Sequence, residues 1–320
     1  MTTLTKFGQT VRLSVYDSNS KLILDTSGLR VDFHVSIQAT WNAAKFTIYN
    51  LAPETIKQLS KGKGYIRLFT QLHDMPTQEL NYDFVINNVF SVKQVPNSVT
   101  ELYCLDRSKV IFGDKQVQMQ VTNPTLKRYC EALAKAAKAD ITFKYTDFPV
   151  NVLDYSPPSP KAVWSGTVLG ALTKLGRQYS FTVNAEAGNV INLIFQPKDD
   201  NQKQSGQDKR PSYVLKTENM RSNPRIGIAK ILIESNLDLS IRNGTILDTS
   251  KLITATTAEG FQTAATLANQ VQAAVEGNAR YVTLTVEHKG SNYTNQWVTT
   301  AMAYKPVKGT KMDDPDCPKG

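Results

Sequence analysis

The chain has 320 residues, of which 41% are hydrophobic and 20% charged, and 37 Lys and Arg against 28 Asp and Glu give a formal net charge of +9. This composition is typical of a globular protein with a buried core and excludes wholesale disorder. No apolar run approaches the roughly 20 residues of a membrane helix, and the N-terminus lacks the features of a signal peptide, so we expect folding in a cytoplasm.

The first 121 residues read as a β domain. The clearest strand alternates apolar with polar residues, the apolar ones being Leu29, Val31, Phe33, Val35 and Ile37. A similar alternation at 117–121 predicts another strand. A short helix is predicted over 53–59, because proline suits the first helical position and an acidic residue suits the positive end of the helix dipole. Many short strands separated by turn-prone residues predict a barrel or sandwich.

The middle of the chain, residues 122–200, has the pattern of a small mixed α/β domain. Asn123-Pro124 predicts a helix start, with Asn123 as N-cap, and apolar residues recur at helical spacing up to Ala137. A second helix is predicted over 167–175, ended by Gly176. A β-hairpin follows it. The polar stretch at 197–212 is predicted to be a linker.

Residues 201–320 are predicted to form a second β domain. Strands are indicated at 226–228, 231–233, 237–241, 282–286 and 297–303. The segment 258–276 interrupts them with apolar residues on one helical face, so we expect a helical insertion there. The tail from Lys305 is polar.

Little in the sequence indicates catalysis. The three histidines, His34, His73 and His288, belong to no metalloprotease, nucleophile-elbow or phosphate-loop motif, and we expect each to be exposed or hydrogen-bonded. The three cysteines form no CxxC pair, which argues against zinc and against a disulfide framework. The basic residues form no run of five or six like charges. We therefore expect a non-enzymatic protein without cofactor or metal.

Three segments together resemble stretches of phage tail baseplate hub proteins, the late control D-like family. Residues 44–55 (AKFTIYNLAPET) resemble a segment near the start of these proteins. Residues 223–244 are similar to their pattern of a proline turn, two strands and a glycine turn. Residues 279–300 resemble their closing segment, in which histidine and glycine precede W-x-T. Ser291 departs from that segment, because the family usually has aspartate there.

The resemblance implies a fold and a role. Hub proteins have two tube-type β-barrels in each chain, here flanking the mixed α/β domain, and three chains form a ring with pseudo-sixfold symmetry. The ring adapts the hexameric tail tube to the trimeric central spike. The expected partners are two further copies, the tail tube protein, the spike, other baseplate subunits and the tape measure protein. DNA would only pass through the channel, and the location would be the virion tail baseplate, assembled in the host cytoplasm.

The candidate structural or interface residues lie in the resembling segments. In the first barrel they are Phe46, Ile48, Tyr49 and Leu51, and in the second Pro224, His288 and Trp297. Core packing without any interface role explains these residues equally well.

Three other functions stay open from the sequence. The chain could be another distal tail protein or adaptor. It could be a DNA-binding protein, for which the net charge is the argument. It could be a tail-associated cell-wall hydrolase, which would need carboxylates or a metal in a cleft.

Overall fold

The computed structural model describes residues 8–38, 42–61, 64–73, 75–80, 82–95, 97–138, 141–146, 148, 152–154, 161–186, 189–195, 211–226, 230–252 and 280–304. The chain divides into two compact units, one comprising Met1–Arg107 and Pro211–Lys305, the other Ser108–Arg210 and Pro306–Gly320. The helical insertion predicted at 258–276, the polar tail and most of the predicted linker lie outside the described residues.

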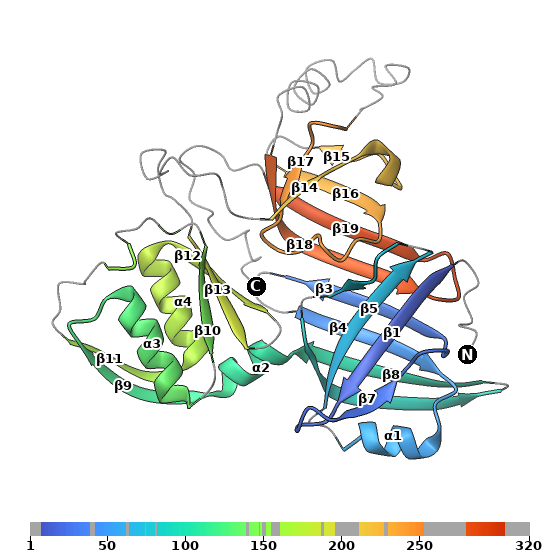
Figure 1. The fold of residues 1–320 in the computed structure, drawn as a ribbon, viewed down its shortest axis with the longest axis horizontal. Coiled ribbons are helices and arrows are strands. Elements are labelled where there is room, and N and C mark those ends of the chain that lie inside the picture. Colours follow the sequence, from blue (N-terminus) through green and yellow to red (C-terminus); the bar gives the residue numbers. More distant parts are fainter. Residues whose placement is uncertain are drawn as a thin grey trace, which may run out of the picture. The chain divides into compact units, whose positions relative to one another are not determined.

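The first unit is built on a 14-stranded sheet (Figure 1). From the first β region come β1 (Gln9–Tyr16), β2 (Leu22–Asp25), β3 (Val31–Ile37), β4 (Asn42–Tyr49), β5 (Tyr65–Leu72), β6 (Gln78–Glu79), β7 (Phe84–Gln94) and β8 (Asn97–Asp106), with helix α1 (Pro53–Leu59). From the last come β14 (Ser212–Val214), β15 (Arg225–Ile226), β16 (Lys230–Asn236), β17 (Ile246–Asp248), β18 (Arg280–Ser291) and β19 (Trp297–Tyr304), with a 3-10 turn at Thr217–Asn219.

The two β regions join where β3 pairs with β18. The pairing is antiparallel and runs from Val286 opposite Ile37 to Ser291 opposite Asp32. The main path of the sheet is β15-β16-β19-β18-β3-β4-β8-β7-β5-β1-β2, and among the described strands it stays open. β5 and β1 cross over β3, β4 and β8 (Figure 1). One hydrophobic core contains side chains of both regions. The fold of this unit is therefore mainly β.

Local sequence patterns explain most of these elements. In β3 the predicted alternation is confirmed, since Val31, Phe33, Val35 and Ile37 are buried while His34 is exposed. Helix α1 begins at Pro53, as predicted, and packs against the hydrophobic core through the buried Leu59.

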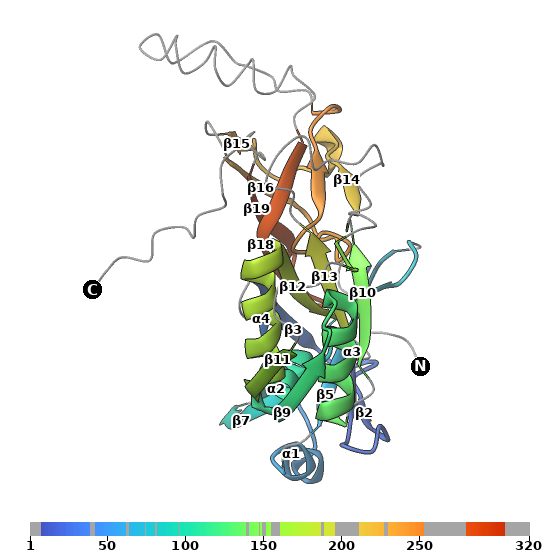
Figure 2. The same ribbon diagram turned by 90° about the vertical axis from the view of Figure 1, so that its left-hand side faces the viewer.

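The second unit combines three helices with short strands. Its elements are α2 (Arg107–Asp114), whose first residue still belongs to the first unit, β9 (Gln116–Thr122), α3 (Leu126–Ala137), β10 (Thr142–Thr146), β11 (Lys161–Thr167), α4 (Val168–Tyr179), β12 (Phe181–Glu186) and β13 (Val190–Phe195). Figure 2 shows α3 and α4 side by side. Strands β10, β13 and β12 form one sheet, and β11 and β9 form another. The strand predicted at 117–121 thus exists but pairs with β11, inside this unit.

Helices α3 and α4 of the second unit each differ from the prediction at one end. Asn123 adopts a left-handed backbone (φ 48°), and it is Thr125 that caps α3 by accepting a hydrogen bond from the Arg128 N–H at 3.2 Å. Helix α4 continues past Gly176 to Tyr179. A Cβ at Gly176 would lie 2.5 Å from the Phe181 carbonyl oxygen, so this glycine permits close packing and does not end the helix.

Candidate assembly surface

Three of the four anchors expected in the first β region are core residues. Phe46 and Ile48 are fully buried in β4, and Leu51 is almost fully buried just beyond it. The Phe46 ring meets Phe84 of β7 edge-on, with ring centroids 6.0 Å apart. These side chains therefore hold the layers of the first unit together.

Tyr49, the fourth anchor, lies on the other face of β4 and is only half-buried. Its hydroxyl donates to an Asp32 carboxylate oxygen at 2.8 Å, and the Arg30 guanidinium lies over its ring, 4.0 Å from the centroid. Arg30 also stacks on Tyr293, which follows β18. Burial is the main reason why the pKa of Tyr49 is raised. Tyr49 thus belongs to a polar cluster where the two β regions meet.

His288 and Trp297 are both buried in the last β region. The sequence placed His288 after a strand, whereas it lies inside β18, with Nδ1 2.9 Å from the Thr299 hydroxyl of β19. The Thr299 hydroxyl also accepts a hydrogen bond from the Asp238 N–H at 2.9 Å. His288 and Thr299 together therefore hold the loop that follows β16. Burial lowers the pKa of His288 from 6.5 to about 4, and the ring is neutral at pH 7.

Pro224 is half-buried next to β15, outside the hydrophobic core. A contact that the sequence did not indicate also links the two β regions. Gln78 of β6 accepts the Leu239 N–H at 2.9 Å and donates to the Asp238 carboxylate at 3.3 Å.

One face of the sheet carries ion pairs, one between neighbouring strands and one along a single strand. Lys45 of β4 lies 2.6 Å from Glu101 of β8, and Tyr103 donates to the same carboxylate at 2.9 Å. On β18, Lys289 lies 2.9 Å from Glu287. The Lys45 ammonium lowers the pKa of Glu101, and Lys289 lowers the pKa of Glu287. Lys45 and Lys289 are therefore each held by a carboxylate on this face.

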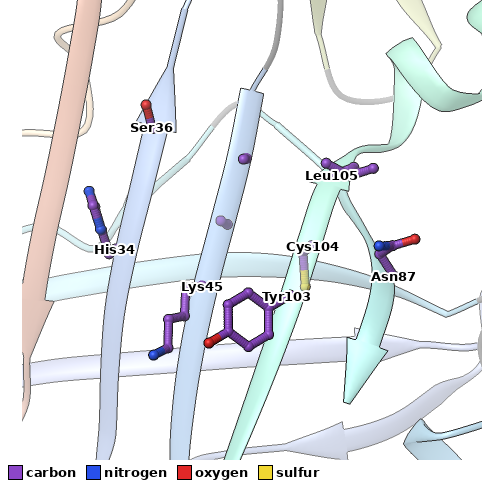
Figure 3. A pocket seen from close by; sticks show the side chains of 9 residues that line it. His34, Ser36, Lys45, Asn87, Tyr103, Cys104 and Leu105 are labelled. Atoms are coloured by element: carbon purple, nitrogen blue, oxygen red, sulfur yellow. The ribbon is translucent and has the colours of Figure 1, made fainter. Parts of the chain in front are cut away.

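A hollow of about 250 Å³ lies on the same face, over β3, β4 and β8 (Figure 3). It opens where β4 carries only Ala43 and Ala44, beside the bulge that places Asn87 in β7. Its one thiol, Cys104, is buried, and burial raises its pKa far above neutral. Lys45 at the rim is already paired with Glu101. The hollow thus holds no activated nucleophile.

Within the described ranges, no group of three or more His, Cys, Asp or Glu side chains could hold a metal ion. Of the helices described, none is long and apolar enough to cross a membrane.

A surface feature that the sequence analysis missed is the β7–β8 hairpin, where Phe90 and Val92 of β7 are exposed. A signal was present, because residues 89–92 carry apolar side chains on both faces of the strand. The ion pairs of the sheet face gave no such signal, since Lys45 and Glu101 are far apart in the sequence.

The fold is that of phage tail proteins. The chain is similar to a tail protein from Neisseria meningitidis MC58, with a TM-score of 0.55 and 9% identity over 93% of this chain and 96% of that one. It is also similar to the 43 kDa tail protein of prophage MuSo2 from Shewanella oneidensis, with a TM-score of 0.56 and 8% identity over 93% and 97%.

A third similar structure comes from a secretion machine. It is an E. coli component of the type VI secretion system, described as structurally similar to the T4 bacteriophage tail proteins gp27 and gp5. Its TM-score is 0.52, with 13% identity over 87% of this chain and 74% of that one. No protein-family model matches the sequence, and no curated protein matches it either.

Proposed function

We propose that this chain is a structural subunit of a phage or phage-like tail, and specifically its baseplate hub. Three copies would form a ring with pseudo-sixfold symmetry between the hexameric tail tube and the trimeric central spike. The observation that carries the proposal is the likeness to two tail proteins over nearly the full length of this chain and of theirs. The E. coli protein described as similar to gp27 and gp5 supports a position next to a spike.

The architecture of the first unit supports a pair of tube-type barrels. Each β region gives strands to the shared sheet and folds further strands back over it. In the first region these are β5, β1 and β2, and in the last they are β17 and β14. The two β regions are joined through β3 and β18. If each region corresponds to one barrel, three chains would place six similar β regions around the ring. The second unit would be the mixed α/β domain of this proposal.

The sheet face with paired charges suits a channel wall. DNA binds cations that are free to replace its counterions. Here Lys45 and Lys289 are held by Glu101 and Glu287, so these two ammonium groups are not free to bind a passing polyanion. In this proposal the buried candidate residues Phe46, Ile48, Leu51, His288 and Trp297 act as folding anchors, while Tyr49 and Pro224 lie at the surface.

Light scattering of the purified protein, alone and with the spike subunit, tests the proposal. A trimer, or a monomer that the spike converts to a three-to-three complex, is the expected result. A protein that stays monomeric in the presence of both tube and spike subunits would overturn it.

A further inference from the structure

The β7–β8 hairpin exposes an unusual number of large apolar side chains. Phe90 is 56% exposed, Val92 57%, Val95 87% and Tyr103 38%. Phe90 and Tyr103 contact each other edge-on, with centroids 5.6 Å apart. The turn end of the hairpin extends beyond the neighbouring strands (Figure 1). Apolar side chains that gather on one exposed element are typical of an interaction surface.

The outer edge of this hairpin is also unpaired. β5 pairs with β7 only at Val85 and Phe84. After the bulge between Ile86 and Asn88, no other described strand lies along that edge. Proteins usually protect such an edge with charges or proline, and here Lys93 is the single charge of β7. Apolar side chains are therefore exposed beside an edge that no described strand pairs, although helix α1 lies next to β7.

The same face of the sheet carries an exposed apolar side chain at its other end. Leu232 of β16 is 37% exposed and lies opposite Met302 of β19. The strand pairings connect this face across β19, β18, β3, β4 and β8 to Phe90 and Val92. The ion pairs of Lys45 and Lys289 lie between the two apolar ends. The face thus has an apolar hairpin at one end, Leu232 between the charged Lys230 and Glu234 at the other, and paired charges in the centre.

We propose that the β7–β8 hairpin of one copy packs against the Leu232 end of the sheet of a second copy. The inference rests on the proposed ring and names its contact. A ring with threefold symmetry joins subunits head to tail, so each chain must offer two different, complementary surfaces. Leu232 and the hairpin provide such a pair on one sheet face. A hairpin-to-hairpin contact would close a dimer and leave Leu232 exposed.

Cysteine cross-linking tests the contact directly. Val92→Cys and Leu232→Cys are combined in a Cys317→Ser background and treated with a short thiol cross-linker. Six strand spacings separate β7 from β16 along the sheet, about 29 Å, and a cross-link within one copy would leave a monomer in the gel, so it cannot be mistaken for a contact between copies. The expected result is a covalent trimer in a denaturing gel. Each single variant should show at least tenfold less of it.

A matched pair controls for chance collisions. Val163→Cys with Leu232→Cys uses another exposed apolar residue, 69% exposed in β11 of the second unit, and should not cross-link. If light scattering shows a trimer but the Val92–Leu232 pair does not cross-link, the contact is wrong and the hub proposal stands. If the pair cross-links only into dimers or open chains, the contact stands and the three-membered ring is wrong.

Charge substitution provides an independent test of the proposed contact. Val92→Asp should weaken trimer formation at least tenfold while far-UV circular dichroism stays unchanged, because the side chain is exposed in the single chain. Met75→Asp, at a residue that is 62% exposed in the loop before β6, should leave the trimer intact. Equal effects of the two variants would overturn the assigned contact.

Discussion

The hydroxyl of Ser291 donates a hydrogen bond to the carboxylate of Asp32 and so joins the last strand region to the first. The same hydroxyl accepts the N–H groups of Tyr293 and Thr294, each at 3.1 Å. In the family that the sequence resembles, this position usually carries aspartate. In this chain Asp32 supplies the carboxylate from the neighbouring strand, which accounts for a serine at 291.

The pairing predicts that Ser291→Asp destabilises the protein. It would place a second carboxylate against Asp32 in a site where Ser291 is almost fully buried. We expect a loss of about 1–3 kcal/mol in the free energy of unfolding, because like charges that are buried together repel each other. Urea unfolding of the first variant and of Asp32→Asn/Ser291→Asp measures this. The double variant should recover at least half of the loss, and no recovery would contradict the explanation.

Ile48→Asp should prevent folding. Ile48 is fully buried in β4, where an unpaired carboxylate costs on the order of 4 kcal/mol or more. Ala43→Asp is the matched control, since Ala43 lies on the exposed face of the same strand. Circular dichroism and soluble yield compare the two variants. A soluble, folded Ile48→Asp protein would show that the segment at 44–55 does not anchor the core.

His288 predicts a fall in stability with acid. Burial lowers its folded-state pKa to about 4, with only partial compensation from Asp238 and the Ile241 backbone, whereas the unfolded chain titrates near 6.5. Between pH 6.5 and 4 the unfolded state binds the extra proton, so stability falls as pH falls, by up to about 3 kcal/mol. Thermal unfolding across this range should show a shallower slope in His288→Gln. Met75→Gln, at an exposed residue that does not titrate, should keep the wild-type slope.

Local patterns predicted α1 and most of the strands because their causes lie within a few residues. The alternation of β3 and the proline at the start of α1 are examples. The strand predicted at 237–241 was wrong, because this segment forms a loop with a turn after β16. Tertiary contacts decided the rest. The shared sheet depends on β3 meeting β18, whose residues are about 250 positions apart, and no periodicity encodes that pairing. Likewise, Gly176 suggested a helix end but serves the close approach of Phe181.

The same distinction between local patterns and tertiary contacts applies to the candidate site. The sequence resemblance located Phe46, Ile48 and Trp297, which the structure buries. It gave no indication that the opposite face of those strands carries paired charges or ends in exposed apolar residues. Such features arise only when strands from distant parts of the chain are set side by side.

The paired charges predict how DNA binding responds to substitution. Replacing Glu101 and Glu287 by Gln would free Lys45 and Lys289, whose ammonium groups they now hold at 2.6 and 2.9 Å. The slope of log affinity for duplex DNA against log salt should then steepen by about 1 for each freed lysine. Glu54→Gln in α1 removes one negative charge at a distance from this face and should leave the slope nearly unchanged. If Glu54→Gln acts as strongly per charge as the other two, net charge governs binding and the face has no special role. A steeper slope confined to Glu101→Gln and Glu287→Gln would indicate that pairing keeps the sheet face from holding DNA.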